Sequence, residues 1–268
     1  MAFLTANNLN MYYEQLGSGP DVLVINGTGN DLRVKPNIMD SPLTAQFRVT
    51  AYDQRGLGQT DKPQTGYTMA NYADDAAALM QALNIESALV LGISFGGMVA
   101  QELAIRHGAH IKKLALWCTA AGGDGGASYP LHELADLDDA ARLRQMMKLN
   151  DSRVDDAFID ANPDIVAAAQ ARADLSAYAD EPNWAHGRAQ QLAARATHDC
   201  WSRLDLIACP VKLMGGQYDQ IAPPAVMQAM ATQIPDPDLT FYEGGHLFML
   251  QDAQVFPDLI DFFQKDAK

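Results

Sequence analysis

The chain has 268 residues, 48% of them hydrophobic, which is enough to bury the core of one large globular domain. Its formal net charge is −14, from 19 Lys and Arg against 33 Asp and Glu, and this excess of acidic residues argues against nucleic acid or an anionic membrane surface as a partner. The three cysteines form no C-x-x-C pair, and the sequence has no signal-peptide pattern. No apolar run approaches the ~18 residues of a membrane span. These features predict a cytoplasmic protein.

The first part of the chain is predicted to form strands. Residues 2–15 have β-type content and lead into the turn residues 17–20, which predicts a hairpin. Residues 21–25 are the apolar run of a buried strand, and a glycine-rich loop follows at residues 26–31. This loop lacks the spacing of phosphate-binding loops, so two interpretations stay open: a loop that binds an oxyanion, and a plain turn.

A further strand and an amphipathic helix come next. Residues 47–52 predict the strand, and a long polar turn follows it. In that turn Asp53 and Arg55 are expected to hold the loop through an ion pair or backbone hydrogen bonds, not to act in catalysis. Residues 68–83 place apolar side chains at helical spacing and predict a helix with one buried face.

Residues 88–107 are the unit around which the rest of the chain is organised. A short apolar strand runs into Gly-Ile-Ser-Phe-Gly at residues 92–96, which fits G-x-S-x-G, and a helix pattern follows. A serine on such a strand–turn–helix bend exposes its hydroxyl on a strained backbone. The N-terminus of the helix points at Ser94 and favours negative charge there. The alternative interpretation is a glycine-rich turn that carries a surface serine.

The composition changes after a strand predicted at residues 113–118. Glycines at residues 122–126 are followed by an Ala-rich, helical stretch up to Trp201. We therefore predict an α/β core at residues 1–124 and 202–268, with a helical cap inserted at 125–201. Four bulky residues are predicted to line a substrate pocket, although ordinary packing is an alternative for each; they are Met146, Met147, Trp184 and Phe248.

The C-terminal part returns to alternating strands and helices. Strands are predicted at residues 209–214 and 238–242, and helices at 223–234 and 251–264. This alternation along most of the chain predicts a mostly parallel sheet with helices on both faces. In such sheets the functional loops gather beyond the carboxyl ends of the strands.

Three side chains just past strand ends occur in the order Ser94, Asp219, His246, which is the order of an α/β-hydrolase triad. Serine needs a neutral imidazole to take its proton, and a buried carboxylate orients that imidazole. Asp124, which follows the strand at 113–118, is the less favoured alternative for the acid. The backbone N–H groups of Thr28 and Phe95 are the predicted oxyanion donors. No His, Cys, Asp or Glu cluster has metal-ligand spacing, so neither a metal nor a cofactor is expected.

The chain resembles the α/β-hydrolase fold superfamily over nearly its whole length, through LVINGTG, YDQRGLGQTDKP, GISFGG, LMGGQYDQIAPP and EGGH. Within the superfamily it is similar to the small bacterial 3-oxoadipate enol-lactonases, carboxylesterases and cofactor-free haloperoxidases. The resemblance implies that Ser94 is the nucleophile, Asp219 the acid and His246 the base. A serine at position 94 speaks against the haloalkane dehalogenase and epoxide hydrolase branches. One departure is Asn26, where the superfamily commonly has histidine.

Three functions follow as hypotheses. The first is a serine hydrolase that cleaves a carboxylic ester or lactone of a small-molecule substrate through an acyl-enzyme on Ser94. The second is hydrolysis of a carbon–carbon bond in a β-diketone or ring-cleavage product, which the same triad serves. The third is a ligand-binding pseudo-enzyme, since a fold alone does not imply activity.

Overall fold

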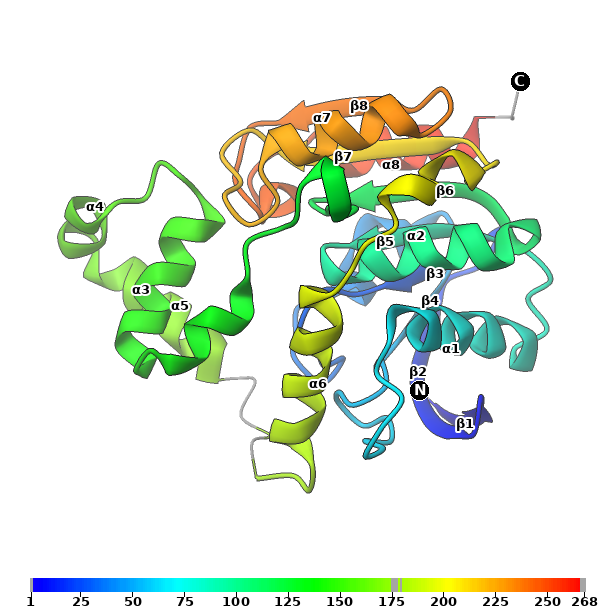
Figure 1. Ribbon diagram of the computed structural model, residues 1–268, viewed down its shortest axis with the longest axis horizontal. Helices are drawn as coiled ribbons and strands as arrows, with labels where there is room; N and C mark the ends of the chain where they lie inside the picture. The colour runs from blue at the N-terminus through cyan, green and yellow to red at the C-terminus, as the bar shows by residue number, and fades with distance from the viewer. Residues whose placement is uncertain (1, 175–177, 179, 266–268) are drawn as a thin grey trace.

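A computed structural model of the chain describes residues 2–174, 178 and 180–265 (Figure 1). Within them an eight-stranded sheet has the order β1-β2-β4-β3-β5-β6-β7-β8. Strand β2 pairs antiparallel with β1 and with β4, and every other neighbouring pair is parallel. The strands are β1 (Ala2–Ala6), β2 (Leu9–Leu16), β3 (Asp21–Ile25), β4 (Arg48–Tyr52), β5 (Ala88–Ile93), β6 (Ile111–Trp117), β7 (Val211–Gly216) and β8 (Asp238–Tyr242).

Helices cover both faces of the sheet. One face packs on α1, α2 and α7, and the other face packs on α8. The helices of the core are α1 (Met69–Ala82), α2 (Phe95–His107), α7 (Pro224–Gln233) and α8 (Val255–Gln264). This arrangement confirms the predicted α/β-hydrolase fold with a mostly parallel central sheet.

The apolar strand runs divide between the two faces because successive side chains of a strand point in opposite directions. In β3, Leu23 lies in the core on the α1–α2 side, whereas Val22 and Val24 lie in the core on the α8 side. In β5, Val90 and Leu91 divide in the same way. A continuous apolar run is therefore needed in each central strand, as the sequence predicted.

Strand β7 is longer at its carboxyl end than predicted. The sequence suggested that the turn begins at Gly215, but β7 continues through Gly216, which pairs with Tyr242 of β8. A Cβ on Gly216 would lie 2.0 Å from the carbonyl oxygen of Gly245. The glycine therefore permits close approach of the His246 loop to the strand.

The segment between β6 and β7 forms the helical part predicted as a cap. It contains α3 (Asp139–Asn150), α4 (Asp156–Ala161), α5 (Pro163–Asp174) and α6 (Trp184–Ala196). In Figure 1, α3, α4 and α5 lie at one end of the molecule, and α6 lies between them and the core. The domain boundaries at residues 125 and 201 stay a prediction.

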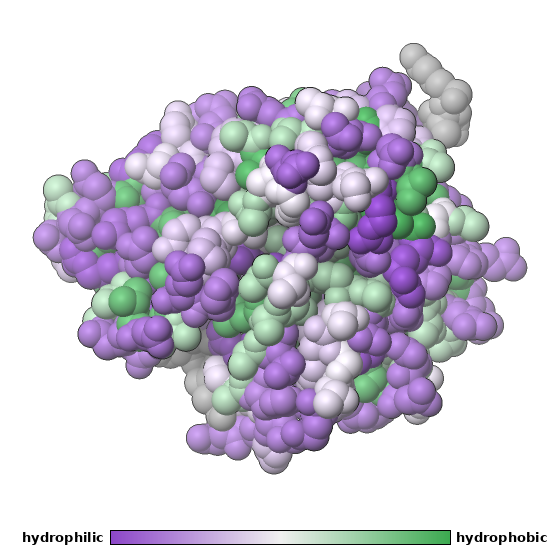
Figure 2. Space-filling model, in the orientation of Figure 1, coloured by the Kyte–Doolittle hydropathy of each residue, from purple (hydrophilic) through white to green (hydrophobic). Residues whose placement is uncertain are grey.

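The outer surface agrees with the high net charge. The face in Figure 2 is largely hydrophilic, with hydrophobic residues in small patches. Among the described residues, no helix combines the length and the apolar character needed to cross a membrane. The predicted cytoplasmic location stays a prediction.

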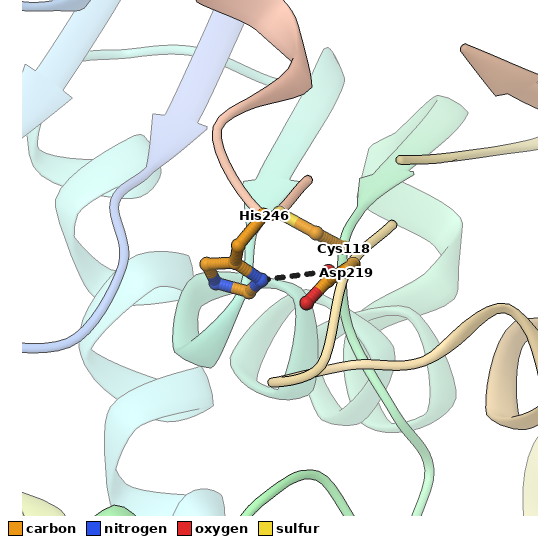
Figure 3. A group of neighbouring side chains, drawn as sticks. All are labelled: Cys118, Asp219 and His246. Carbon is orange, nitrogen blue, oxygen red and sulfur yellow. Dashed lines mark hydrogen bonds and ion pairs between the residues drawn. The ribbon is translucent and has the colours of Figure 1, made fainter. Parts of the chain in front are cut away.

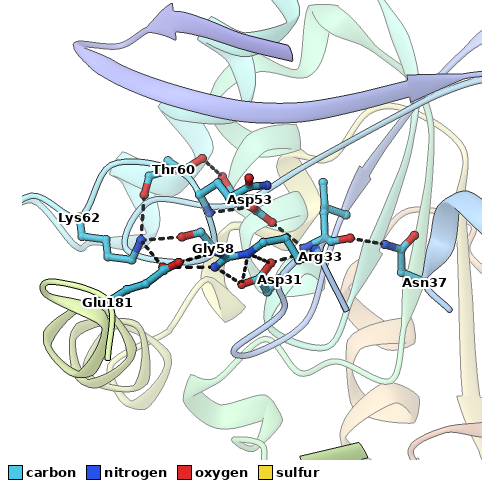
Figure 4. A network of polar contacts seen from close by, with 10 residues as sticks. Asp31, Arg33, Asn37, Asp53, Gly58, Thr60, Lys62 and Glu181 are labelled. Carbon is cyan, nitrogen blue, oxygen red and sulfur yellow. Dashed lines mark hydrogen bonds and ion pairs between the residues drawn. The ribbon is translucent and has the colours of Figure 1, made fainter. Parts of the chain in front are cut away.

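A charged network joins the cap segment to the core (Figure 4). Arg33 donates both to Asp31 and to Glu181, which precedes α6, and Lys62 lies 3.7 Å from the same Glu181 carboxylate. The guanidinium of Arg33 also lies over the ring of Tyr178, 3.4 Å from its centroid. Asp53 accepts backbone hydrogen bonds from Leu32 and Gln59, so its predicted role in holding the loop is confirmed. Arg55 pairs with Asp75 of α1, not with Asp53.

Candidate active site

Ser94 sits on the sharp turn between β5 and α2. Its backbone has φ 54° and ψ −113°, a conformation that side-chain-bearing residues rarely adopt. The turn is held by the N–H of Ser94, which donates to the carbonyl of Trp117, and by the hydroxyl of Thr119, which donates to the carbonyl of Ser94. The surroundings therefore fix the strained residue at the carboxyl end of the sheet.

The glycines on either side of Ser94 are required by close contacts. A Cβ on Gly96 would lie 1.9 Å from the carbonyl oxygen of Ile25, and a Cβ on Gly92 would lie 2.6 Å from the Cβ of Ala100. Any larger residue would force β3 or α2 away from the turn. The G-x-S-x-G pattern thus follows from packing as well as from backbone geometry.

Ser94, His246 and Asp219 lie in one hydrogen-bonded chain. The Oγ of Ser94 is 3.0 Å from Nε2 of His246, and Nδ1 of His246 is 2.7 Å from Oδ2 of Asp219. A carboxylate only accepts, so Nδ1 carries the proton and donates to Asp219. Nε2 is then free to accept from the serine hydroxyl. The structure brings together the three residues that the sequence predicted for the triad.

Asp219 is fully buried, and its second oxygen is also occupied. Its Oδ1 accepts from the backbone N–H groups of Ile221 and Ala222, at 2.7 and 2.9 Å. These bonds fix the carboxylate and leave Oδ2 for the imidazole (Figure 3). Asp124, the alternative acid, is exposed in the turn after β6 and takes no part in this chain.

The loop that carries His246 is anchored on the end of α3. The N–H of His246 donates to the carbonyl of Asn150 at 2.6 Å, and a Cβ on Gly245 would lie 1.8 Å from that oxygen. Gln251 accepts from the N–H of Gly245 and donates to Asp151. The cap segment thus positions the imidazole. No local sequence pattern predicts these contacts, because Asn150 lies almost a hundred residues from the His246 loop.

The loop after β3 reaches the turn of Ser94. A Cβ added to Gly27 would lie 3.6 Å from the Cβ of Ser94. As the first residue of α2, Phe95 has no intrahelical acceptor for its N–H. No described residue accepts from the N–H of Thr28. The two predicted oxyanion donors are therefore on adjoining turns, and their role stays a proposal.

Asn26, which replaces the histidine common in the superfamily, does not brace this loop. Its side-chain Nδ2 is buried without a hydrogen-bond partner among the described residues, and its carbonyl accepts from Gln54 at 2.8 Å. The loop is braced from α6 instead, because Oε1 of Gln191 accepts from the N–H of Gly29 at 2.8 Å. The sequence carried no signal for this long-range contact.

Cys118 completes a buried cluster with Asp219 and His246. One potential ligand atom from each lies within 4.8 Å of the others (Figure 3). Burial, followed by the nearby Asp219 charge, raises the pKa of the Cys118 thiol well above its usual value. Within the cluster, His246 donates to Asp219 through Nδ1 and faces the hydroxyl of Ser94 through Nε2. The cluster fits a packed thiol beneath the triad better than a metal centre.

The four predicted pocket residues have different environments. Met146 and Met147 are half-buried on α3, and Trp184 is half-buried at the start of α6. Phe248 differs from the prediction. Its side chain is fully buried and stacks on Tyr242 at 5.5 Å between ring centroids, so its contacts are those of a core residue.

The fold, with these three side chains at the carboxyl edge of its sheet, is that of the α/β hydrolases as a class. The family model of the alpha/beta hydrolase fold matches residues 20–253. The chain belongs to this family.

Individual relatives point to more than one kind of hydrolase. The chain is 27% identical to a 2-hydroxymuconate semialdehyde hydrolase of Pseudomonas putida over 94% of this chain and 89% of that protein. It is 25% identical to the 3-oxoadipate enol-lactonase 1 of Acinetobacter baylyi, over 94% and 91%. The crystal structure of the enol-lactonase from Burkholderia xenovorans LB400 superposes with a TM-score of 0.80 at 23% identity, covering 98% of this chain and all of that one (100%).

Other curated relatives match more closely over a shorter stretch. Uncharacterized mycobacterial proteins are 35% identical over 123 residues, and the match spans 46% of this chain and 35% of their own length. The family match and the relatives confirm the predicted resemblance to 3-oxoadipate enol-lactonase. They do not distinguish between ester, lactone and carbon–carbon bond cleavage.

Proposed function

We propose that the chain is a serine hydrolase that cleaves a carboxylic ester or lactone through an acyl-enzyme on Ser94. The observation that carries the proposal is the hydrogen-bonded chain from Ser94 Oγ through His246 to the buried carboxylate of Asp219. The contacts run from the serine hydroxyl to the imidazole and from the imidazole to the carboxylate, which is the order that acyl transfer needs.

The proposed reaction begins with attack of Ser94 Oγ on the carbonyl carbon. His246 Nε2 takes the serine proton as the bond forms, and Asp219 stabilises the imidazolium that results. The carbonyl oxygen becomes an oxyanion that the N–H groups of Thr28 and Phe95 bind, each worth about 3–4 kcal/mol in the transition state. His246 then protonates the leaving alcohol. A water molecule, activated by the same imidazole, hydrolyses the acyl-enzyme.

The test is hydrolysis of p-nitrophenyl butyrate by wild type, Ser94→Ala and a matched control. Ser202→Ala makes the same change at an exposed serine. We expect Ser94→Ala to lower kcat by at least ~10⁴-fold and Ser202→Ala to leave it unchanged. Wild-type turnover no faster than that of Ser94→Ala would contradict the proposal.

A second candidate is hydrolysis of a carbon–carbon bond, which the full-length similarity to 2-hydroxymuconate semialdehyde hydrolase favours. The same nucleophile would serve this reaction. The discriminating assay compares kcat/KM for 2-hydroxymuconate semialdehyde with that for 3-oxoadipate enol-lactone. A higher kcat/KM for the semialdehyde would favour carbon–carbon bond cleavage over ester or lactone hydrolysis as the natural reaction.

A further inference from the structure

One segment of the cap is hydrogen-bonded to both of the loops that carry the proposed acid and base. It comprises residues 149–153, the end of α3 and the residues just after it, and we call it the strap. The acid loop is residues 217–221 and the base loop is residues 243–247. The strap contacts the base loop through the N–H of His246, which donates to the carbonyl of Asn150 at 2.6 Å.

The strap is bonded to the acid loop as well, on both sides of Asp219. The N–H of Gln220 donates to the carbonyl of Leu149 at 3.0 Å. The N–H of Ser152 donates to the carbonyl of Tyr218 at 2.9 Å. The residues before and after the acid are thus held by the same segment that holds the base. The distance between the carboxylate and the imidazole therefore depends on the strap.

Arg153 joins the strap to the two loops through its side chain. Its Nε and Nη2 donate to the carboxylate of Asp151 within the strap, at 2.9 and 2.7 Å. Its Nη1 donates to Glu243 of the base loop at 2.5 Å. The guanidinium also lies over the ring of Tyr218 in the acid loop, 4.1 Å from the centroid. A planar guanidinium makes these contacts together, because its donors lie along its edges while its face stays free for the ring.

Asp151 extends the contact of Arg153 to the residue that precedes the base. Only 7% of Asp151 is exposed, and the hydrogen bond from Arg153 lowers its pKa, so it is a carboxylate. Its Oδ2 also accepts from Nε2 of Gln251 at 3.2 Å. Oε1 of Gln251 in turn accepts from the N–H of Gly245 at 2.8 Å. Loss of Arg153 would leave this buried charge without its main partner, which is costly, and Asp151 is then expected to shift.

We propose that Arg153 is a positioning residue for the hydrogen-bonded pair of Asp219 and His246. It acts through the strap, by holding the acid loop and the base loop against one segment of the cap. The inference rests on the proposed function, because it assigns this role within the proposed acyl transfer. A misplacement of reacting groups by about 1 Å can cost on the order of 10²-fold in rate, so a smaller shift can still lower kcat.

The first experiment measures kcat and KM for p-nitrophenyl butyrate in Arg153→Gln. We expect kcat to fall about 10-fold and KM to change by less than about twofold, because the reacting groups shift while substrate binding is kept. Arg153→Lys keeps the charge without the planar set of donors, so its kcat should lie between those of wild type and Arg153→Gln. An unchanged kcat in Arg153→Gln, or a rise in KM alone, would overturn the proposal.

Arg144→Gln is the matched control, on α3. The side chain of Arg144 is 37% exposed, compared with 43% for Arg153, and it also pairs with two acidic residues. Those residues, Asp156 and Asp160, lie on α4, away from the acid and base loops. The control therefore removes the same charge and is expected to keep kcat within about twofold of wild type. Equal losses in the two variants would overturn the proposal, because the loss would then follow from charge alone.

A double-mutant cycle tests whether Arg153 acts through the pair. Asp219→Asn breaks the hydrogen bond between the acid and the base. In this background Arg153→Gln should change the rate by less than about twofold, because the geometry that Arg153 maintains is already lost. The rate is read as stoichiometric labelling by diisopropyl fluorophosphate, which can be followed in slow variants. A further loss of about 10-fold would show that Arg153 acts independently of the pair, and would overturn the proposal.

A spectroscopic measurement separates this inference from the proposed function. The proton that His246 Nδ1 donates to Asp219 over 2.7 Å should give a far-downfield ¹H NMR resonance that Asp219→Asn lacks. Arg153→Gln should shift or broaden it, and Arg144→Gln should not. An unchanged resonance in Arg153→Gln, or a wild type without one, would contradict the inference. If no ester is cleaved but the resonance responds as expected, the proposed function fails and the positioning role stands.

Discussion

Two regions that face the same site differ in how their polar groups are satisfied. At the carboxyl edge of the sheet, both oxygens of Asp219 and both ring nitrogens of His246 have partners. On the inner face of α6, by contrast, Arg195 and Gln191 are buried with donors that no described residue accepts. The first region is thus fully hydrogen-bonded among the described residues, and the second is not.

This difference indicates that the core and the cap have different roles. Reacting groups gain from fixed geometry, because preorganised dipoles need no reorganisation in the transition state. Gln191 and Arg195 instead join segments of the chain, through Gly29 and Tyr129. The same division explains why the triad was predictable: its residues lie on turns after strands, whereas the α6 donors depend on how the cap packs.

The largest expected effect comes from a substitution of Asp219 in the fully hydrogen-bonded region. In Asp219→Asn one oxygen can still accept from Ile221 and Ala222, but an N–H₂ then faces His246 Nδ1 and favours the tautomer that cannot accept from Ser94. We expect kcat for p-nitrophenyl butyrate to fall about 10⁴-fold. Asp124→Asn, at the exposed alternative acid, is the control and should keep kcat within about twofold. Equal losses in the two variants would contradict the assignment of the acid.

A smaller effect is expected from separating α6 from the core. A Cβ on Gly187 would lie 1.9 Å from the carbonyl oxygen of Gly56, so Gly187→Ala must displace α6. Urea unfolding should give a loss of about 2–3 kcal/mol, together with a higher KM. Gly108→Ala is the control, since nothing lies within 4 Å of the added methyl group and the backbone φ is −55°. A Gly187→Ala variant as stable as this control would show that α6 is not packed tightly on the loop.

The smallest effect is a change in the pH dependence of stability at the end of α6. Burial lowers the pKa of His198 from 6.5 to about 4. Between these two pH values His198 is neutral in the folded protein and protonated in the unfolded protein. Stability is therefore lost as pH falls below 6.5, by about 2 kcal/mol at pH 5. In urea titrations from about pH 7.5 to 5, His198→Gln should lack this loss. Exposed His132→Gln should retain it, and a parallel pH profile for His198→Gln would refute the prediction.

The sequence predicted the core well for physical reasons that are local. Apolar runs of five or six residues alternate along the chain with segments whose apolar residues have helical spacing. The bounds predicted for β3 and β8 are those found in the structure. The turn of Ser94 was recognisable because only glycine fits at positions 92 and 96. These features depend on neighbours in the sequence, so a single chain reveals them.

The remaining parts of the site depend on contacts between distant segments. The anchoring of His246 on Asn150 and the brace from Gln191 to Gly29 join loops whose register no periodicity fixes. Phe248 was predicted to line the pocket as a bulky residue, but it stacks on Tyr242 in the core, a contact that no local pattern specifies. Helical spacing in the cap predicts helices and does not predict which face meets the site.

The most direct test of the account is covalent labelling with diisopropyl fluorophosphate, read by mass spectrometry of the intact protein and of its peptides. We expect wild type to gain one diisopropylphosphoryl group with loss of fluoride, located on the peptide that contains Ser94. Ser94→Ala should gain none, and Asp219→Asn should react far more slowly. An unlabelled wild type, or a label on another residue, would mean that Ser94 is not an activated nucleophile.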